Sequence, residues 1–164
     1  HSGRHALRRH LFDVPAGAVD APALLAPILI DDGAALVIRD RTADGVENDY
    51  PFRIGDAEEY VPNHAPTLGG DPTRVCLMGY HLTRAGLLLD ATVFDVTGGG
   101  EEALGQDRVG LVGRSEADAL GLDRLYLSLE THGLAEGEYE LRASIRDPEN
   151  GFEQTVRSPF RIGR

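Results

Sequence analysis

Residues 134–162 of the chain read LAEGEYELRASIRDPENGFEQTVRSPFRI. Tyr139, Leu141 and Ile145 stand at alternate positions, and polar or charged residues lie between them. Successive side chains of a β-strand point to opposite faces, so this pattern predicts a strand with one face on a core and one in water. Residues 147–151 then supply a Pro and an Asn-Gly pair, which reverse the chain. The stretch therefore predicts an antiparallel hairpin.

Tyr139 lies near the start of the first of these two strands. In immunoglobulin-like sandwiches, a Tyr at this place bonds its hydroxyl to backbone a few residues upstream, in an arrangement known as the tyrosine corner. Gly137, two residues earlier, permits the close approach that such a corner needs. We therefore predict that Tyr139 is a structural residue and not part of a ligand site.

Strands with good turn residues between them recur about every ten residues in the second half of the chain. They are expected over residues 74–82, 86–96, 122–130, 138–146 and 152–162. The 20 Gly and 9 Pro of the chain agree with many turns and short strands. This spacing is typical of an all-β, immunoglobulin-like antiparallel sandwich.

The apolar positions of these strands predict the core of the sandwich. It should include Leu77, Leu87, Leu89, Val93, Leu125, Leu127, Leu129, Leu141, Ile145, Phe160 and Ile162. Residues 98–114 break the pattern, and we expect a mobile hairpin loop there with one weak strand near residues 109–112.

The chain divides by composition into unequal parts. Residues 1–3 resemble a tag remnant, so we expect the chain to be excised from a longer protein. Residues 4–62 predict an N-terminal β-rich segment, either a separate unit or part of the same domain. Residues 63–73 are rich in Pro, Gly and Asn and predict a connection. Residues 74–164 should hold the sandwich.

The chain carries a net charge of −11. Phosphate groups bind clustered cations, so this charge argues against partners such as nucleic acid or an anionic membrane surface. No stretch approaches the roughly 20 continuous apolar residues of a membrane helix, and no membrane insertion is expected. Cys76 is the only cysteine, which rules out a disulfide within the chain, and its apolar neighbours predict a small buried side chain.

Several stretches together resemble a known group of proteins. They are residues 80–82 (YHL), 125–127 (LYL), 134–141 (LAEGEYEL) and 159–162 (PFRI). Over residues 26–162 the chain resembles the C-terminal β-rich region of bacterial von Willebrand factor A-related and GWxTD-type secreted proteins. The chain has neither the Asp-x-Ser-x-Ser metal motif of a von Willebrand A domain nor the Trp of a GWxTD motif. It therefore resembles only the β-rich region that follows those motifs in such proteins. The resemblance implies an extracytoplasmic, immunoglobulin-like accessory module, periplasmic or at the cell surface.

Carboxylates crowd the loops that follow the first apolar run. Asp31, Asp32, Asp40 and Asp44 supply the hard oxygen ligands that calcium prefers, although their spacing is not that of an EF-hand. Acidic residues in loops also cap turns. Both interpretations stay open, and these four residues are the candidate calcium ligands.

The histidines after His1 are scattered along the chain. His5, His10, His64, His81 and His132 show neither an HExxH nor a His-x-His spacing. Zinc needs converging nitrogen or sulfur ligands, so neither a zinc site nor any other cofactor is expected.

Catalytic motifs are equally lacking in the sequence. The neighbours Glu101 and Glu102 should point to opposite faces of an extended chain, unlike the facing carboxylates of a glycosidase. There is no Gly-x-Ser-x-Gly elbow, phosphate loop or dinucleotide fingerprint. Tyr126 is the aromatic residue that we expect to face outward, and it is the candidate platform for a sugar.

These observations rank three classes of function. First comes a non-catalytic interaction or spacer module of a larger bacterial cell-envelope protein, which contacts a protein partner or other domains of the same polypeptide. A carbohydrate-binding module is the second class, and an uncharacterised enzyme is the third. The sequence gives no indication of an oligomeric state.

Overall fold

The computed structural model describes the following residues: 21–31, 53–54, 58–59, 61–63, 66–69, 71–83, 86–115, 117 and 121–163. Across them the chain is all-β, with no α-helix and only two short 3₁₀ turns, η1 (Thr97–Gly99) and η2 (Gln106–Arg108). Within these ranges no helix is long and apolar enough to cross a membrane.

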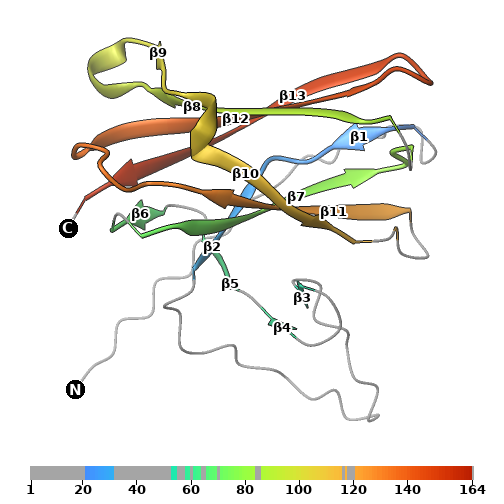
Figure 1. Ribbon diagram of the computed structural model, residues 1–164, viewed down its shortest axis with the longest axis horizontal. Helices are drawn as coiled ribbons and strands as arrows, with labels where there is room; N and C mark the ends of the chain where they lie inside the picture. Colours follow the sequence, from blue (N-terminus) through green and yellow to red (C-terminus); the bar gives the residue numbers. More distant parts are fainter. Residues whose placement is uncertain are drawn as a thin grey trace, which may run out of the picture.

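Most of the strands form two packed layers, and the two short strands Arg53–Ile54 and Glu58–Glu59 pair with each other in a separate sheet (Figure 1). In chain order they are β1 (Ala23–Leu24), β2 (Ile28–Asp31), β3 (Arg53–Ile54), β4 (Glu58–Glu59), β5 (Val61–Asn63), β6 (Thr67–Leu68), β7 (Thr73–Tyr80), β8 (Leu88–Asp95), β9 (Glu102–Ala103), β10 (Val109–Arg114), β11 (Leu122–Leu129), β12 (Gly137–Asp147) and β13 (Phe152–Ile162). The first sheet has the order β10-β11-β7-β2-β5, and β1 also pairs with β7. The second sheet has the order β6-β13-β12-β8-β9. The prediction of an all-β sandwich is confirmed.

The hairpin predicted in residues 134–162 is present as β12 and β13. The two strands pair antiparallel from Gly137 opposite Ile162 to Asp147 opposite Phe152. Gly151 has a φ of 72°, a conformation that glycine adopts without strain, and its N–H donates to the carbonyl oxygen of Asp147 over 2.9 Å. Residues 147–151 therefore form the chain reversal that the sequence predicts.

The first part of the chain also contributes to the sandwich. β1 and β2 come from the segment 4–62, and both pair antiparallel with β7. The backbone of Leu24 exchanges two hydrogen bonds with the side-chain amide of Gln154 in β13, over 2.8 and 3.0 Å. The expected connection 63–73 contains β6, which runs parallel to the end of β13. These contacts close one side of the sandwich.

Most of the predicted core is buried between the sheets. The buried residues of that prediction are Leu77, Val93, Leu125, Leu127, Leu129, Leu141, Ile145, Phe160 and Ile162. The prediction is wrong in part for Leu87 and Leu89. Both are only half-buried and pack at the margin of the core. Leu89 lies in β8, and Leu87 directly precedes that strand.

The outer faces of the two sheets differ in chemistry. On the first sheet, Cys76 and Met78 point away from the core and form a buried outer cluster with Ile30. On the second sheet, the outer positions of β12 and β13 carry cross-strand ion pairs such as that between Arg146 and Glu153. The second sheet therefore presents a solvated polar face, whereas β7 is buried on both faces.

Candidate interaction surface

A groove lined by aliphatic side chains and by backbone runs between β8 and β10, along the open side of the sandwich. It encloses about 400 Å³ and is lined by Leu87, Leu88, Leu89, Ala91, Val109, Leu111 and Leu127. β8 belongs to the second sheet and β10 to the first, so the groove lies where the two layers separate. Among the described residues of this lining, every side chain is aliphatic.

The groove exists because the chain changes sheets at this point. β9 pairs with the end of β8, with Ala103 opposite Phe94. The N–H of Leu104 then donates to the carbonyl oxygen of Val93 over 2.8 Å. Directly afterwards the chain turns through η2 into β10 of the other sheet. In the part of the chain that the structure describes, no strand pairs with the outer edge of β8 from Leu88 to Thr92.

Large apolar side chains are exposed around this groove. Leu88 is 57% exposed and Leu111 is 59% exposed, and Val112, which follows Leu111 but does not line the groove, is 70% exposed. Among the described residues, only Leu25 joins them as an exposed large hydrophobic residue. Single exposed apolar residues are ordinary, but a group of them beside an apolar groove is typical of an interaction surface.

A second cavity, of about 390 Å³, lies where β12 and β13 meet the segment around Pro66. The aromatic side chains that line it are part of the buried core. The rings of Tyr139 and Phe160 stack with their centroids 5.5 Å apart, and both residues are buried. We therefore assign the second cavity no ligand.

Tyr139 forms the predicted corner. Its hydroxyl donates a hydrogen bond to the carbonyl oxygen of Ala135, and burial raises its pKa, so the hydroxyl keeps its proton. Gly137 is required for another contact, since a Cβ there would lie 2.5 Å from the Oγ1 of Thr97. That hydroxyl joins η1 to β12 through the backbone N–H and carbonyl oxygen of Glu138. The hydrogen bond predicted for a tyrosine corner is therefore present.

Two buried carboxylates lie in a polar network that the sequence did not indicate. Asp123 forms a two-point ion pair with Arg114, with nitrogen to oxygen distances of 3.3 and 3.0 Å. Asp147 accepts hydrogen bonds from the hydroxyl of Thr83 over 2.8 Å and from the N–H of Glu149 over 3.0 Å. Arg114 also donates to the carbonyl oxygen of Thr83 over 3.0 Å, which links the two carboxylates and the two sheets.

This network is structural in character. Burial alone would raise the pKa of Asp147, but the hydrogen bonds from Thr83 and from the turn backbone lower it below its ordinary value. Asp147 is therefore an ionised acceptor held by donors, and not a proton donor poised for catalysis.

The outer face of the second sheet holds a group of charges around Arg142. Its guanidinium lies 4.0 Å from the ring centre of Phe94 and 2.9 Å from a carboxylate oxygen of Glu101, and it also contacts Glu140. The hydrogen bond from Arg142 lowers the pKa of Glu101. Because Arg142 covers Phe94, that ring is not available as a flat platform for a sugar.

Most of the candidate calcium ligands lie outside the part of the chain that the structure describes. Asp32, Asp40 and Asp44 lie outside the described residues, and only the backbone of Asp31 is described, in β2. Calcium binding there stays a prediction. Over the described ranges, no group of three or more His, Cys, Asp or Glu residues could hold a metal ion.

Tyr126 lies on the outward side of β11, opposite Cys76 in β7. It is half-buried against the outer cluster of Ile30, Cys76 and Met78. Sugar binding through Tyr126 stays a prediction, and the ring offers less free surface than its place in the sequence suggests.

Comparisons with known proteins identify no family for this chain. No protein-family model matches the chain, and no curated protein matches it. Among solved structures, the chain is similar to part of a family 123 glycoside hydrolase from Clostridium perfringens, which was solved to analyse the hydrolysis of glycolipid glycans. The likeness has a TM-score of 0.45 and 11% identity, and it covers 61% of this chain and 22% of that chain. We take no activity from it.

Proposed function

We propose that this chain is a non-catalytic interaction module and that it binds its partner in the groove between β8 and β10. The observation that carries the proposal is a groove of aliphatic side chains with the exposed Leu111 in its lining and the exposed Leu88 at the adjoining edge of β8. Apolar surface of this kind gains about 25 cal/mol for every Å² removed from water, so a partner that covers it is stabilised.

The buried polar groups support a binding role over a catalytic one. Asp123 and Asp147 are both engaged by donors of the fold. No described nucleophile, base and group of oxyanion donors converge on the groove, whose described lining side chains are all aliphatic. An enzyme therefore remains the third candidate, after a carbohydrate-binding module.

The wider setting of the module rests on sequence resemblance. The tyrosine corner at Tyr139 supports an immunoglobulin-like variety of sandwich. The resemblance over residues 26–162 supports a place in a larger bacterial cell-envelope protein, outside the cytoplasm. In that setting the groove would receive a separate protein or another domain of the same polypeptide.

A displayed-peptide selection tests the proposal directly. Random 12-residue peptides are selected on the immobilised protein, and their affinities are measured for the wild type, Leu111→Ser and Val112→Ser. Both substitutions remove an exposed apolar side chain from β10, but only Leu111 lines the groove. We expect Leu111→Ser to weaken binding about tenfold, which corresponds to about 1.4 kcal/mol, and Val112→Ser to leave it unchanged. Equal effects of the two substitutions, or a selection that yields no binder, would refute the proposal.

A further inference from the structure

The geometry of the groove points to the form of its ligand, and this inference rests on the proposed function. We propose that the groove accepts an extended segment of a partner protein, which pairs with the open edge of β8 as an added strand antiparallel to it. The segment carries apolar side chains at alternate positions and Lys or Arg side chains between them, above all in its N-terminal half.

The backbone of β8 presents the groups that an added strand requires. In an antiparallel pair, hydrogen-bonded positions alternate with positions whose N–H and C=O point the other way. The N–H of Val96 donates to the carbonyl oxygen of Glu138 in β12, over 2.9 Å. Because bonded positions recur at every second residue, the backbone N–H and C=O groups of the even-numbered residues of β8 bond to β12. Leu89 and Ala91 therefore direct their N–H and C=O groups to the open edge.

The chain itself shows how this edge is used. Val93 is in the same phase as Leu89 and Ala91, and its carbonyl oxygen accepts the N–H of Leu104. The side chain of Leu104 packs against the core between the sheets. β9 and Leu104 thus form the first part of an antiparallel strand beside β8. The groove lies beside the rest of β8, where this neighbouring strand would continue if the chain did not turn away into η2.

The side chains of the added strand follow from the same alternation. Residues opposite Leu89 and Ala91 would point inward, onto Val109, Leu111 and Leu127. The lining there is aliphatic, so these positions require apolar side chains. Residues opposite Leu88 and Asp90 would point outward, into water.

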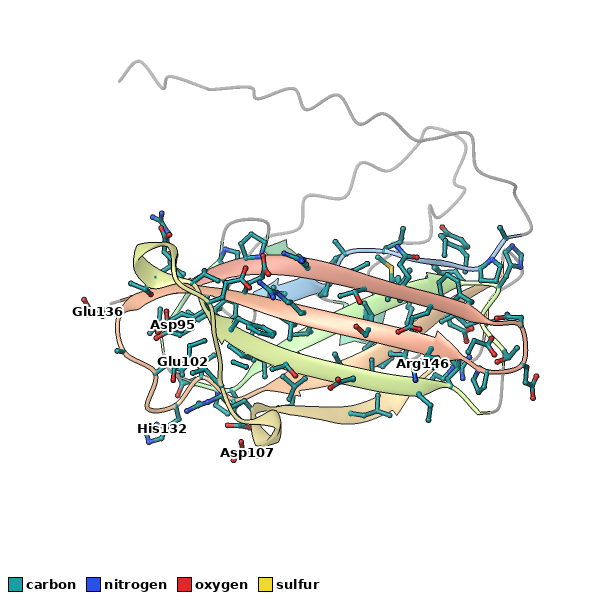
Figure 2. The ribbon with its side chains drawn as sticks, turned by 90° about the horizontal axis from the view of Figure 1, so that it is seen from above. Asp95, Glu102, Asp107, His132, Glu136 and Arg146 are labelled. Carbon is teal, nitrogen blue, oxygen red and sulfur yellow. The ribbon has the colours of Figure 1, made fainter. Side chains whose placement is uncertain are left out.

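The charges around the edge select basic residues for the outward positions. Asp90 is exposed on the outer side of β8. Figure 2 shows Glu102 and Asp107 at one end of the sandwich, in the company of Asp95 and Glu136. A strand antiparallel to β8 begins at that end, so its N-terminal half lies nearest to these carboxylates.

A second copy of the chain fits this edge less well. Each copy has a net charge of −11, and pairing two β8 edges would bring their exposed Asp90 side chains to the same contact. The edge of β10 is also less suitable than that of β8. Its pairing with β11 shifts register between Leu111 and Gly113, and such a bulge obstructs further pairing.

Three synthetic peptides test the form of the ligand. KVKVTVTV and TVTVKVKV have the same composition and differ only in which half carries the Lys residues, and EVEVTVTV reverses the charge. We expect KVKVTVTV to bind the full chain, TVTVKVKV to bind about three- to tenfold more weakly, and EVEVTVTV to show no binding, as measured by fluorescence anisotropy. Equal affinity of the first two peptides would contradict the assigned direction.

Backbone pairing is tested with two methylated forms of KVKVTVTV. Methyl groups on the Val nitrogens remove the N–H groups that face β8, whereas methyl groups on the Lys and Thr nitrogens alter the opposite edge. Only the first form should lose binding. In hydrogen exchange, the amides of Leu89 and Ala91 should slow at least tenfold when KVKVTVTV is bound, because they gain acceptors. The amides of Leu88 and Asp90 already bond to β12 and should change little.

The outcomes separate this inference from the proposed function. If displayed peptides bind and depend on Leu111, but none of the three synthetic peptides binds, then the groove is an interaction site and the added strand is refuted. The same follows if KVKVTVTV binds without protection of Leu89 and Ala91. If sedimentation shows a dimer in which these two amides are protected, then a second copy is the occupant and the inference is wrong.

Discussion

The hydroxyl of Tyr139 lies 2.9 Å from the carbonyl oxygen of Ala135, four residues earlier in the chain, and donates a hydrogen bond to it. This bond fixes the loop that leads into β12. Tyr139→Phe removes the donor and with it this hydrogen bond, so we expect the free energy of unfolding to fall by about 1 kcal/mol. Urea denaturation followed by far-UV circular dichroism measures the change.

Tyr80→Phe provides the matched control. Tyr80 is half-buried at the end of β7, and no hydrogen bond of its hydroxyl to a described residue is found. We expect this substitution to change stability by less than about 0.5 kcal/mol. If Tyr139→Phe is equally neutral, the hydroxyl of Tyr139 is only solvated and the corner does not stabilise the fold.

Leu127 and Leu111 are opposite each other in β11 and β10, but their surroundings differ. Leu127 is buried in the main core, and Leu111 is exposed. Leu127→Ala should lower the free energy of unfolding by about 2 to 5 kcal/mol, because it leaves a cavity. Leu111→Ala should cost less than about 0.5 kcal/mol. Similar losses at both positions would mean that the groove is closed in solution.

Asp147 should contribute to the pH dependence of stability. Its pKa in the folded protein is lowered, so the unfolded chain takes up a proton first as the pH falls. The stabilisation is therefore complete above the unfolded pKa of about 3.9 and is lost as the pH falls through the folded value. We expect Asp147→Asn to lower the melting temperature at pH 7 and to differ less from the wild type below pH 4. A constant difference between pH 7 and pH 3 would show that the charge is not involved.

Calcium is tested by a thermal scan, because ligands that bind only the native state raise the melting temperature. If Asp31, Asp32, Asp40 and Asp44 bind calcium, the melting temperature in 5 mM calcium exceeds that in chelator. Replacing Asp40 and Asp44 together by Asn should abolish the difference. Identical scans of the wild type in calcium and in chelator would exclude a site of millimolar affinity.

The strands themselves were largely predictable from the sequence. The alternation in residues 122–130 and 138–146 gives β11 and β12 almost to the residue, because each strand has one face on a continuous core. β10 is longer than the expected strand 109–112 and includes Gly110 and Gly113, whose lack of a side chain hides a strand from any pattern of hydrophobicity. The two-residue strands are too short to show a period.

The groove could not be predicted in the same way. Leu87 and Leu89 are apolar and in the correct phase, but their burial depends on whether a neighbouring strand covers them. That neighbour is lost when the chain crosses from β9 to β10, and a change of sheet leaves no mark on the alternation of residues. The network of Asp123 and Asp147 was missed for a related reason, since its partners Arg114 and Thr83 are distant in sequence from Asp147.

Cys76 gives the protein a chemical reporter of its own local opening. It is the only thiol of the chain, it is fully buried, and it lies between Ile28 of β2 and Tyr126 of β11. A thiol reagent can react there only when β7 becomes accessible, so the rate of labelling measures how often the first sheet separates from what covers it. No cysteine has to be engineered for this measurement. Because Cys76 lies outside the groove lining, the reaction does not alter the groove itself.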